Sequence, residues 1–180
     1  LSEPCGKCEI CDPEHSLPQG YEHTTAVAAS EYLENIFIDI PPKKQVGNGH
    51  AQAQSRFPNY RFPYRFGELQ HEVGRALCRW GEAGWGEIAK QGKADNQFDK
   101  RLVAASAKMI KKRWEPGQQP TWMTYVPSNM HPKLVAEFAE SLAEKLGISY
   151  VHAVLKVREN APQKDMENTD FRCQNLDGVF

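Results

Sequence analysis

The sequence lacks long hydrophobic runs, a secretory leader pattern and the short motifs of common hydrolases. No stretch of about 18 apolar residues is present, and the first residues do not follow the basic-then-apolar order of a signal peptide. We therefore expect an intracellular protein without a membrane partner. Both G-x-x-x-x-G-K followed by Ser or Thr and H-E-x-x-H are missing. Their absence excludes an ATP-driven motor within this segment.

The sequence also lacks an initiator methionine, internal repeats and any strong overall charge. It begins at Leu1, close to a cysteine motif, so we expect a segment of a longer protein. The formal net charge of the 180 residues is −1, but its distribution is uneven. Positions 1–40 are acidic with Lys7 as their only basic residue, whereas positions 89–114 contain eight lysines and arginines and only two acidic residues.

Three cysteines at intervals of three residues, Cys5, Cys8 and Cys11, stand in a proline-containing segment with few apolar side chains. Thiolates at this spacing bind one zinc ion through a tight turn, and a closed structural site needs four ligands. Alternatives are an iron–sulfur cluster or uncoordinated thiols. Candidates for the fourth ligand are a cysteine upstream of Leu1, then His15. Cys78 and Cys173 are better explained as packing residues.

The apolar periodicity predicts helices over 24–36, 68–80, 97–113 and 132–146, with a tight turn over 81–86. Strands are expected over 121–126 and 150–157. The resulting β-α-β order predicts a parallel pair with a helical crossover. The predicted fold class is α+β with an α/β part.

The segment 56–66 interleaves arginines with aromatic residues. Aromatic faces stack on bases while guanidinium groups bind phosphates, so Arg56, Arg61 and Arg65 are candidate contacts to single-stranded DNA. Aromatics that pack onto a neighbouring part of the protein would explain the same composition.

The predicted helix over 97–113 carries further candidate DNA contacts, because clustered lysines release counterions from phosphates. The candidates are Lys100, Lys108, Lys111 and Lys112. A solvated outer helix face is the alternative interpretation. At the ends of the predicted strands, Ser128, Asn129, Lys156 and Arg158 are candidates for an anion crevice or for ordinary strand-end polar residues.

Two parts of the chain resemble known families. The run Cys5-Gly6-Lys7-Cys8-Glu9-Ile10-Cys11-Asp12 is similar to the last three cysteines of the zinc-binding subdomain that follows the motor of RecQ-like DNA helicases. Several later stretches resemble the tail of one RecQ-like subgroup, which bears a ComF-type phosphoribosyltransferase-like domain. They are Gly74-Arg75-Ala76-Leu77, Gly84-Trp85-Gly86, the run 120–128, the run 162–168 and the closing run 175–180.

The resemblance implies an accessory carboxy-terminal region of a bacterial, nucleoid-associated DNA helicase in the cytoplasm. A zinc knuckle with a helix would occupy 1–40, an arm 41–67, a small helical module of winged-helix-like type 68–117, and a truncated phosphoribosyltransferase-like domain 118–180. The motor upstream would bind ATP and magnesium, and the partner would be single-stranded or forked DNA. A ComF-like phosphoribosyltransferase-family protein and a protein-interaction module are the alternatives.

Overall fold

The computed structural model describes residue 11 and residues 20–114 and 118–180. Its contacts divide the chain into two compact units, Leu1–Asn35 and Ile36–Phe180. Over the described residues, six α-helices accompany two small two-stranded sheets. This mixed composition agrees with the predicted α+β class at a coarse level. No helix in the described ranges is long and apolar enough to cross a membrane.

The first unit contributes helix α1, His23–Asn35, which confirms the helix predicted over 24–36. Its apolar side chains remain exposed: Val27 is 43 %, Tyr32 64 % and Leu33 46 % accessible. Burial of such side chains against other elements normally provides most of the stability of a helix in a folded protein. The apolar side of α1 is therefore a surface feature of this unit.

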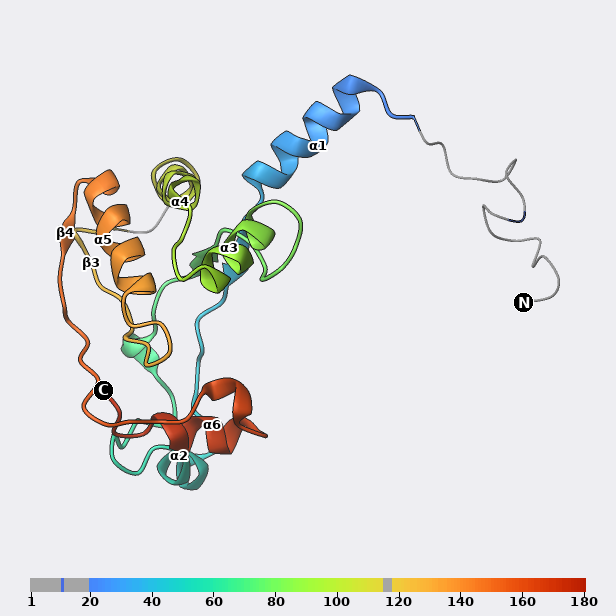
Figure 1. Cartoon of the computed structure of the whole chain (residues 1–180). Coiled ribbons are helices and arrows are strands. Elements are labelled where there is room, and N and C mark those ends of the chain that lie inside the picture. The colour runs from blue at the N-terminus through green and yellow to red at the C-terminus, as the bar shows by residue number, and fades with distance from the viewer. Residues whose placement is uncertain (1–10, 12–19, 115–117) are drawn as a thin grey trace. The chain divides into compact units, whose positions relative to one another are not determined.

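In the second unit, helices α4 (Lys100–Lys112) and α5 (Leu134–Leu146) pack together and supply most of the core (Figure 1). Val103, Ala107, Met109 and Ile110 of α4 meet Leu142 of α5. Each large side chain buried here contributes about 1.5–3 kcal/mol. This core joins the segments on both sides of position 117, where the sequence predicts a domain boundary.

The predicted β-α-β order is present, with shorter strands. Strand β3 (Trp122–Met123) pairs in parallel with β4 (Ser149–Tyr150), and α5 lies between them in the chain. Helix α5 ends at the predicted residue, Leu146, and is followed by Gly147, whose φ of 74° suits a glycine and whose N–H donates to the carbonyl oxygen of Ala143 at 2.9 Å. The long strands predicted over 121–126 and 150–157 are thus each reduced to two residues.

The helix predicted over 68–80 is wrong. This segment instead contains a 3-10 turn, Gly67–Leu69, and strand β2, Gly74–Ala76, which pairs antiparallel with β1, Ile38–Ile40. Gly74 fits closely against its partner, because a Cβ there would lie 3.3 Å from Cβ of Ile40. Long-range strand pairing therefore overrides the helical spacing of the apolar residues.

A helix that the sequence did not predict, α3 (Trp85–Ala94), follows the turn after β2. The predicted tight turn over 81–86 overlaps only its first two residues, and two of its glycines are sites of close approach. A Cβ on Gly86 would lie 2.2 Å from the carbonyl oxygen of Arg79, and one on Gly92 would lie 2.9 Å from Cδ1 of Phe98. The glycines therefore permit packing around α3.

Helix α2 (His50–Arg56) and helix α6 (Thr169–Leu176) lie side by side at the other end of this unit (Figure 1). The side chain of Arg56 pairs with Asp170 at 2.5 Å across the two helices. The chain end joins them as well, because the Tyr60 hydroxyl accepts a hydrogen bond from the N–H of Phe180 at 2.8 Å. The predicted arm, 41–67, is thus attached to the last helix and the tail.

Asp177, which is only 2 % exposed, is the centre of this attachment. Its carboxylate accepts hydrogen bonds from the Asn59 N–H at 2.9 Å, the Asn59 amide at 2.6 Å and the Tyr60 N–H at 3.1 Å. The Arg158 guanidinium donates to the backbone carbonyl of Asp177. Burial raises the pKa of Asp177, but these hydrogen bonds and the Arg158 charge outweigh it and hold the pKa below its ordinary value of 3.8.

We expect Asp177→Asn to destabilise the protein by about 1.5–3 kcal/mol, because an amide loses the charge and faces the Asn59 and Tyr60 donors with its own N–H groups. Urea unfolding measures the loss. The matched control is Asp170→Asn, which removes an ion pair with a 52 % exposed carboxylate and should cost less than about 1 kcal/mol. Equal losses for the two variants would contradict the central role of Asp177.

The stabilisation from Asp177 should depend on pH in one direction. Because the pKa of Asp177 in the folded protein lies below 3.8, its ionised carboxylate contributes its full stabilisation at pH values well above 3.8. This stabilisation is lost as the pH falls through the folded pKa. The difference in unfolding free energy between the wild type and Asp177→Asn should therefore be constant between about pH 5 and 7 and shrink in acid. Unfolding curves across pH measure it, and a difference that grows in acid would contradict the assignment.

Candidate nucleic-acid interface

The exposed side of α4 carries basic side chains on a single arc. At about 3.6 residues per turn, these side chains fall within roughly a third of the circumference, opposite the buried core positions. No acidic residue occurs in the sequence of α4. We call this surface the α4 basic face; it consists of Lys100, Arg101, Lys108, Lys111 and Lys112, all exposed.

Most of the α4 basic face has no compensating carboxylate. Among the described residues, Lys100, Lys108 and Lys112 have no Asp or Glu oxygen within 4.0 Å. Arg101 pairs with Asp99 at 2.7 Å, and the Lys111 amine donates to the Lys145 carbonyl at the end of α5 at 2.9 Å. The surface therefore has a net positive charge on a rigid helix.

Asp99 caps the start of α4, where its carboxylate accepts from the Arg101 N–H at 2.8 Å. Hydrogen bonds from the Arg101 side chain and backbone lower the pKa of Asp99, and the same contact raises the pKa of Arg101. Both groups stay ionised at neutral pH. Arg101 was not among the candidate contacts predicted from sequence, although the helical arc through Lys108 and Lys112 identifies it.

The arm arginines occupy different surroundings. Arg56 is held by Asp170, and its side chain is only 13 % exposed. Arg61 and Arg65 are exposed, and the Arg65 guanidinium lies 5.7 Å from the centre of the Tyr64 ring. Helix α2, which contains Arg56, lies at the opposite end of the unit from α4 (Figure 1). The structure does not combine Arg56 and the α4 lysines in one surface.

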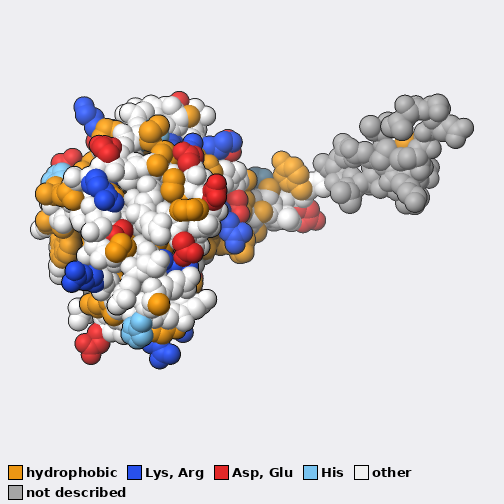
Figure 2. Space-filling model, turned by 90° about the horizontal axis from the view of Figure 1, so that it is seen from below, with side chains coloured by type: hydrophobic (Ala, Val, Ile, Leu, Met, Phe, Trp, Pro, Cys, Tyr) orange, Lys and Arg blue, Asp and Glu red, His pale blue; other side chains and the backbone are white. Residues whose placement is uncertain are grey.

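The arm aromatics pack against one another. Phe62 lies edge-on to Phe57, with ring centres 5.0 Å apart, and also contacts Tyr60 at 5.3 Å and Phe66 at 6.1 Å. Seen from the α2–α6 end, acidic, basic and apolar side chains are interspersed without a patch of one sign (Figure 2). These ring contacts lie within the 56–66 segment itself.

The predicted zinc ligands fall mostly outside the described residues. Cys5, Cys8 and the alternative ligand His15 lie outside them, and Cys11 alone is placed. Within the described part of the chain, no group of three or more His, Cys, Asp or Glu side chains could hold a metal ion. Cys78 and Cys173 are half-buried, and burial followed by the Glu82 charge raises the pKa of Cys78. Both suit packing positions.

The polar residues expected at the strand ends lie several positions beyond β3 and β4, and most of them form hydrogen bonds within the fold. The Ser128 hydroxyl accepts from the His131 N–H at 3.2 Å, and the Asn129 amide donates to Glu159 at 2.5 Å. Arg158 donates to the Asp177 carbonyl. Glu159 therefore places a carboxylate beside Asn129, next to the residues considered for an anion crevice.

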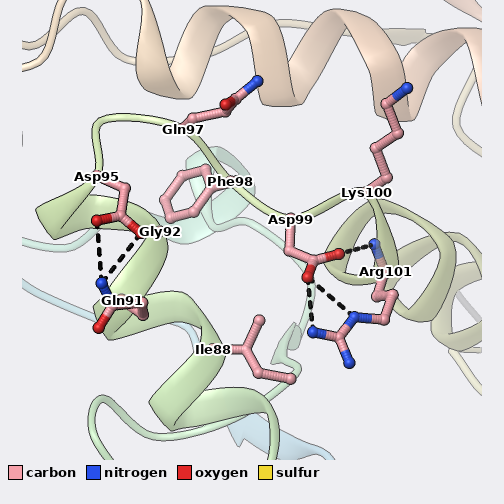
Figure 3. A pocket seen from close by; sticks show the side chains of 9 residues that line it. All are labelled: Ile88, Gln91, Gly92, Asp95, Gln97, Phe98, Asp99, Lys100 and Arg101. Atoms are coloured by element: carbon pink, nitrogen blue, oxygen red, sulfur yellow. Dashed lines mark hydrogen bonds and ion pairs between the residues drawn. The ribbon is translucent and has the colours of Figure 1, made fainter.

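A hollow of about 480 Å³ lies between α3 and the start of α4 (Figure 3). Ile88 and Phe98 supply its apolar surface, and Asp95 and Gln91 lie at its α3 side, hydrogen-bonded to each other at 2.9 Å. Lys100 and Arg101 belong to both this hollow and the α4 basic face. The hollow therefore opens where the basic face begins.

No family model matches the chain, and no curated protein or solved structure matches it either.

Proposed function

We propose that this chain is an accessory region of an ATP-dependent DNA helicase and that it binds DNA through the α4 basic face. One observation carries the proposal: five basic side chains share one exposed arc of a helix that contains no carboxylate. The cysteine run and the tail motifs, which resemble RecQ-like helicases, support the helicase assignment. ATP hydrolysis would belong to a motor outside this chain.

The α4 basic face is suited to phosphates because it is rigid and of one sign. Its buried side is fixed in the core by Val103, Met109 and Ile110, so the lysines project from a backbone that does not need to be ordered on binding. Each phosphate neutralised by a lysine releases counterions, which makes the affinity depend steeply on salt. Such contacts provide affinity without sequence preference.

A phosphoribosyltransferase-like protein is the second candidate, favoured by the parallel β3–β4 pair with α5 between its strands. Its ligand would be a phosphorylated sugar. Calorimetric titration with phosphoribosyl pyrophosphate and magnesium distinguishes the two proposals. Heat of binding that saturates in the absence of DNA would favour the second.

Zinc is part of the proposal, with Cys5, Cys8 and Cys11 as ligands that hold the amino-terminal segment together. We expect metal analysis of protein purified without chelator to find about one zinc per chain, and Cys8→Ser to lower that content, because a closed zinc site needs four ligands. Cys78→Ser and Cys173→Ser are the matched controls and should retain zinc. Full zinc content in Cys8→Ser would contradict the assignment.

The DNA proposal is tested by fluorescence anisotropy with single-stranded and forked DNA across a salt series. We expect the double variant Lys108→Ala/Lys112→Ala to bind severalfold more weakly and to reduce the slope of log affinity against log salt by about 0.7–0.9 per lost phosphate contact. The control, Lys43→Ala/Lys44→Ala, removes the same charge from exposed positions outside α4 and should change neither quantity. A flat salt response of the wild type would contradict DNA binding.

A further inference from the structure

We infer that the hollow between α3 and α4 accepts one unpaired DNA base, so that the α4 basic face binds single-stranded or forked DNA in preference to closed duplex. The inference rests on the proposed function and specifies its substrate. It comes from the position of the hollow, whose lining includes Lys100 and Arg101 of the basic face. A strand whose phosphates follow α4 therefore passes the mouth of the hollow.

The hollow offers an aromatic surface to a base. The Phe98 ring lies among the lining side chains in Figure 3 and is half-buried. The ring is held from two sides. It lies so close to Gly92 that a Cβ there would be 2.9 Å from its Cδ1, and Phe138 of α5 packs against it edge-to-face with ring centres 5.5 Å apart. A ring held in this way can stack on a base without an ordering cost.

The charges in the hollow favour a base over a phosphate. Asp95 and Asp99 line it together with Lys100 and Arg101, so its lining has no net charge, whereas the rest of the α4 basic face is positive and attracts phosphates more strongly. Asp99 is engaged by the Arg101 N–H and guanidinium. Among the residues that the structure describes, the Asp95 side chain accepts from the Gln91 amide only, at 2.9 and 3.0 Å to its two oxygens.

Asp95 therefore retains acceptor capacity, since a carboxylate offers about four lone-pair sites. An exocyclic amino group is the donor that a base presents to such an acceptor, as cytosine does in its contacts with carboxylates. Thymine has no amino group. We expect oligo(dC) to bind more tightly than oligo(dT), and Asp95→Asn to reduce the ratio of the two affinities.

The test compares Phe98→Leu with Phe138→Leu in the full chain. Both substitutions break the same ring pair, but only the first removes an aromatic face from the hollow, because Phe138 does not line it. Affinity is measured by anisotropy for an unpaired oligonucleotide and for the same strand annealed to its complement. Thermal unfolding shows that each variant is folded, and Phe98→Tyr, which keeps the ring, is the rescue.

We expect Phe98→Leu to weaken single-strand binding about tenfold, the size of one lost base-stacking contact, while duplex binding stays unchanged. Phe138→Leu and Phe98→Tyr should retain the wild-type preference. If the wild type binds DNA with a salt-dependent affinity and Phe98→Leu keeps its preference for single strands, the base site is wrong and the basic face stands. If the wild type binds neither DNA, the proposed function fails with it.

Discussion

A single buried residue, Asp177, joins the arm, the segment around Arg158 and the end of the chain. Its carboxylate accepts from the backbone N–H groups of Asn59 and Tyr60, and its backbone carbonyl accepts from the Arg158 guanidinium. A carboxylate so deeply buried is costly unless donors surround it. The α2–α6 end therefore depends on keeping these donors in place, since its helices are short and α6 has no buried residue.

The other end of the unit is organised by apolar packing. Helix α4 buries Leu102, Val103, Met109 and Ile110, and this one-sided burial forces its lysines and Arg101 onto the opposite arc. The α4 basic face is thus a direct consequence of how the core is built. The same packing brings Phe98 between α3 and α5, beside the start of the basic face. The side chains of the candidate interface therefore stand on elements that the core holds in place.

Apolar periodicity and capping residues predicted helices α1, α4 and α5. The start and end of α5 follow from its periodic apolar residues and from Gly147, and α1 and α4 lie close to their predicted ranges. The prediction failed over 68–80, where Leu69, Val73 and Leu77 have helical spacing. There the partner strand Ile38–Ile40, together with the ion pair between Arg75 and Asp39 at 3.1 Å, selects the extended form. No local window contains that partner.

The candidate site was predicted in part. The lysines of α4 could be recognised from charge and periodicity, because a helix with one buried face must expose the other. The hollow beside them could not, since it depends on how α3, which the sequence did not predict, meets the Phe98 segment across Gly92. The sequence by itself determined where the positive charge collects. Only the tertiary structure decided that Arg56 forms an ion pair with Asp170 and that Phe98 borders a hollow. Both features depend on segments that the fold brings together.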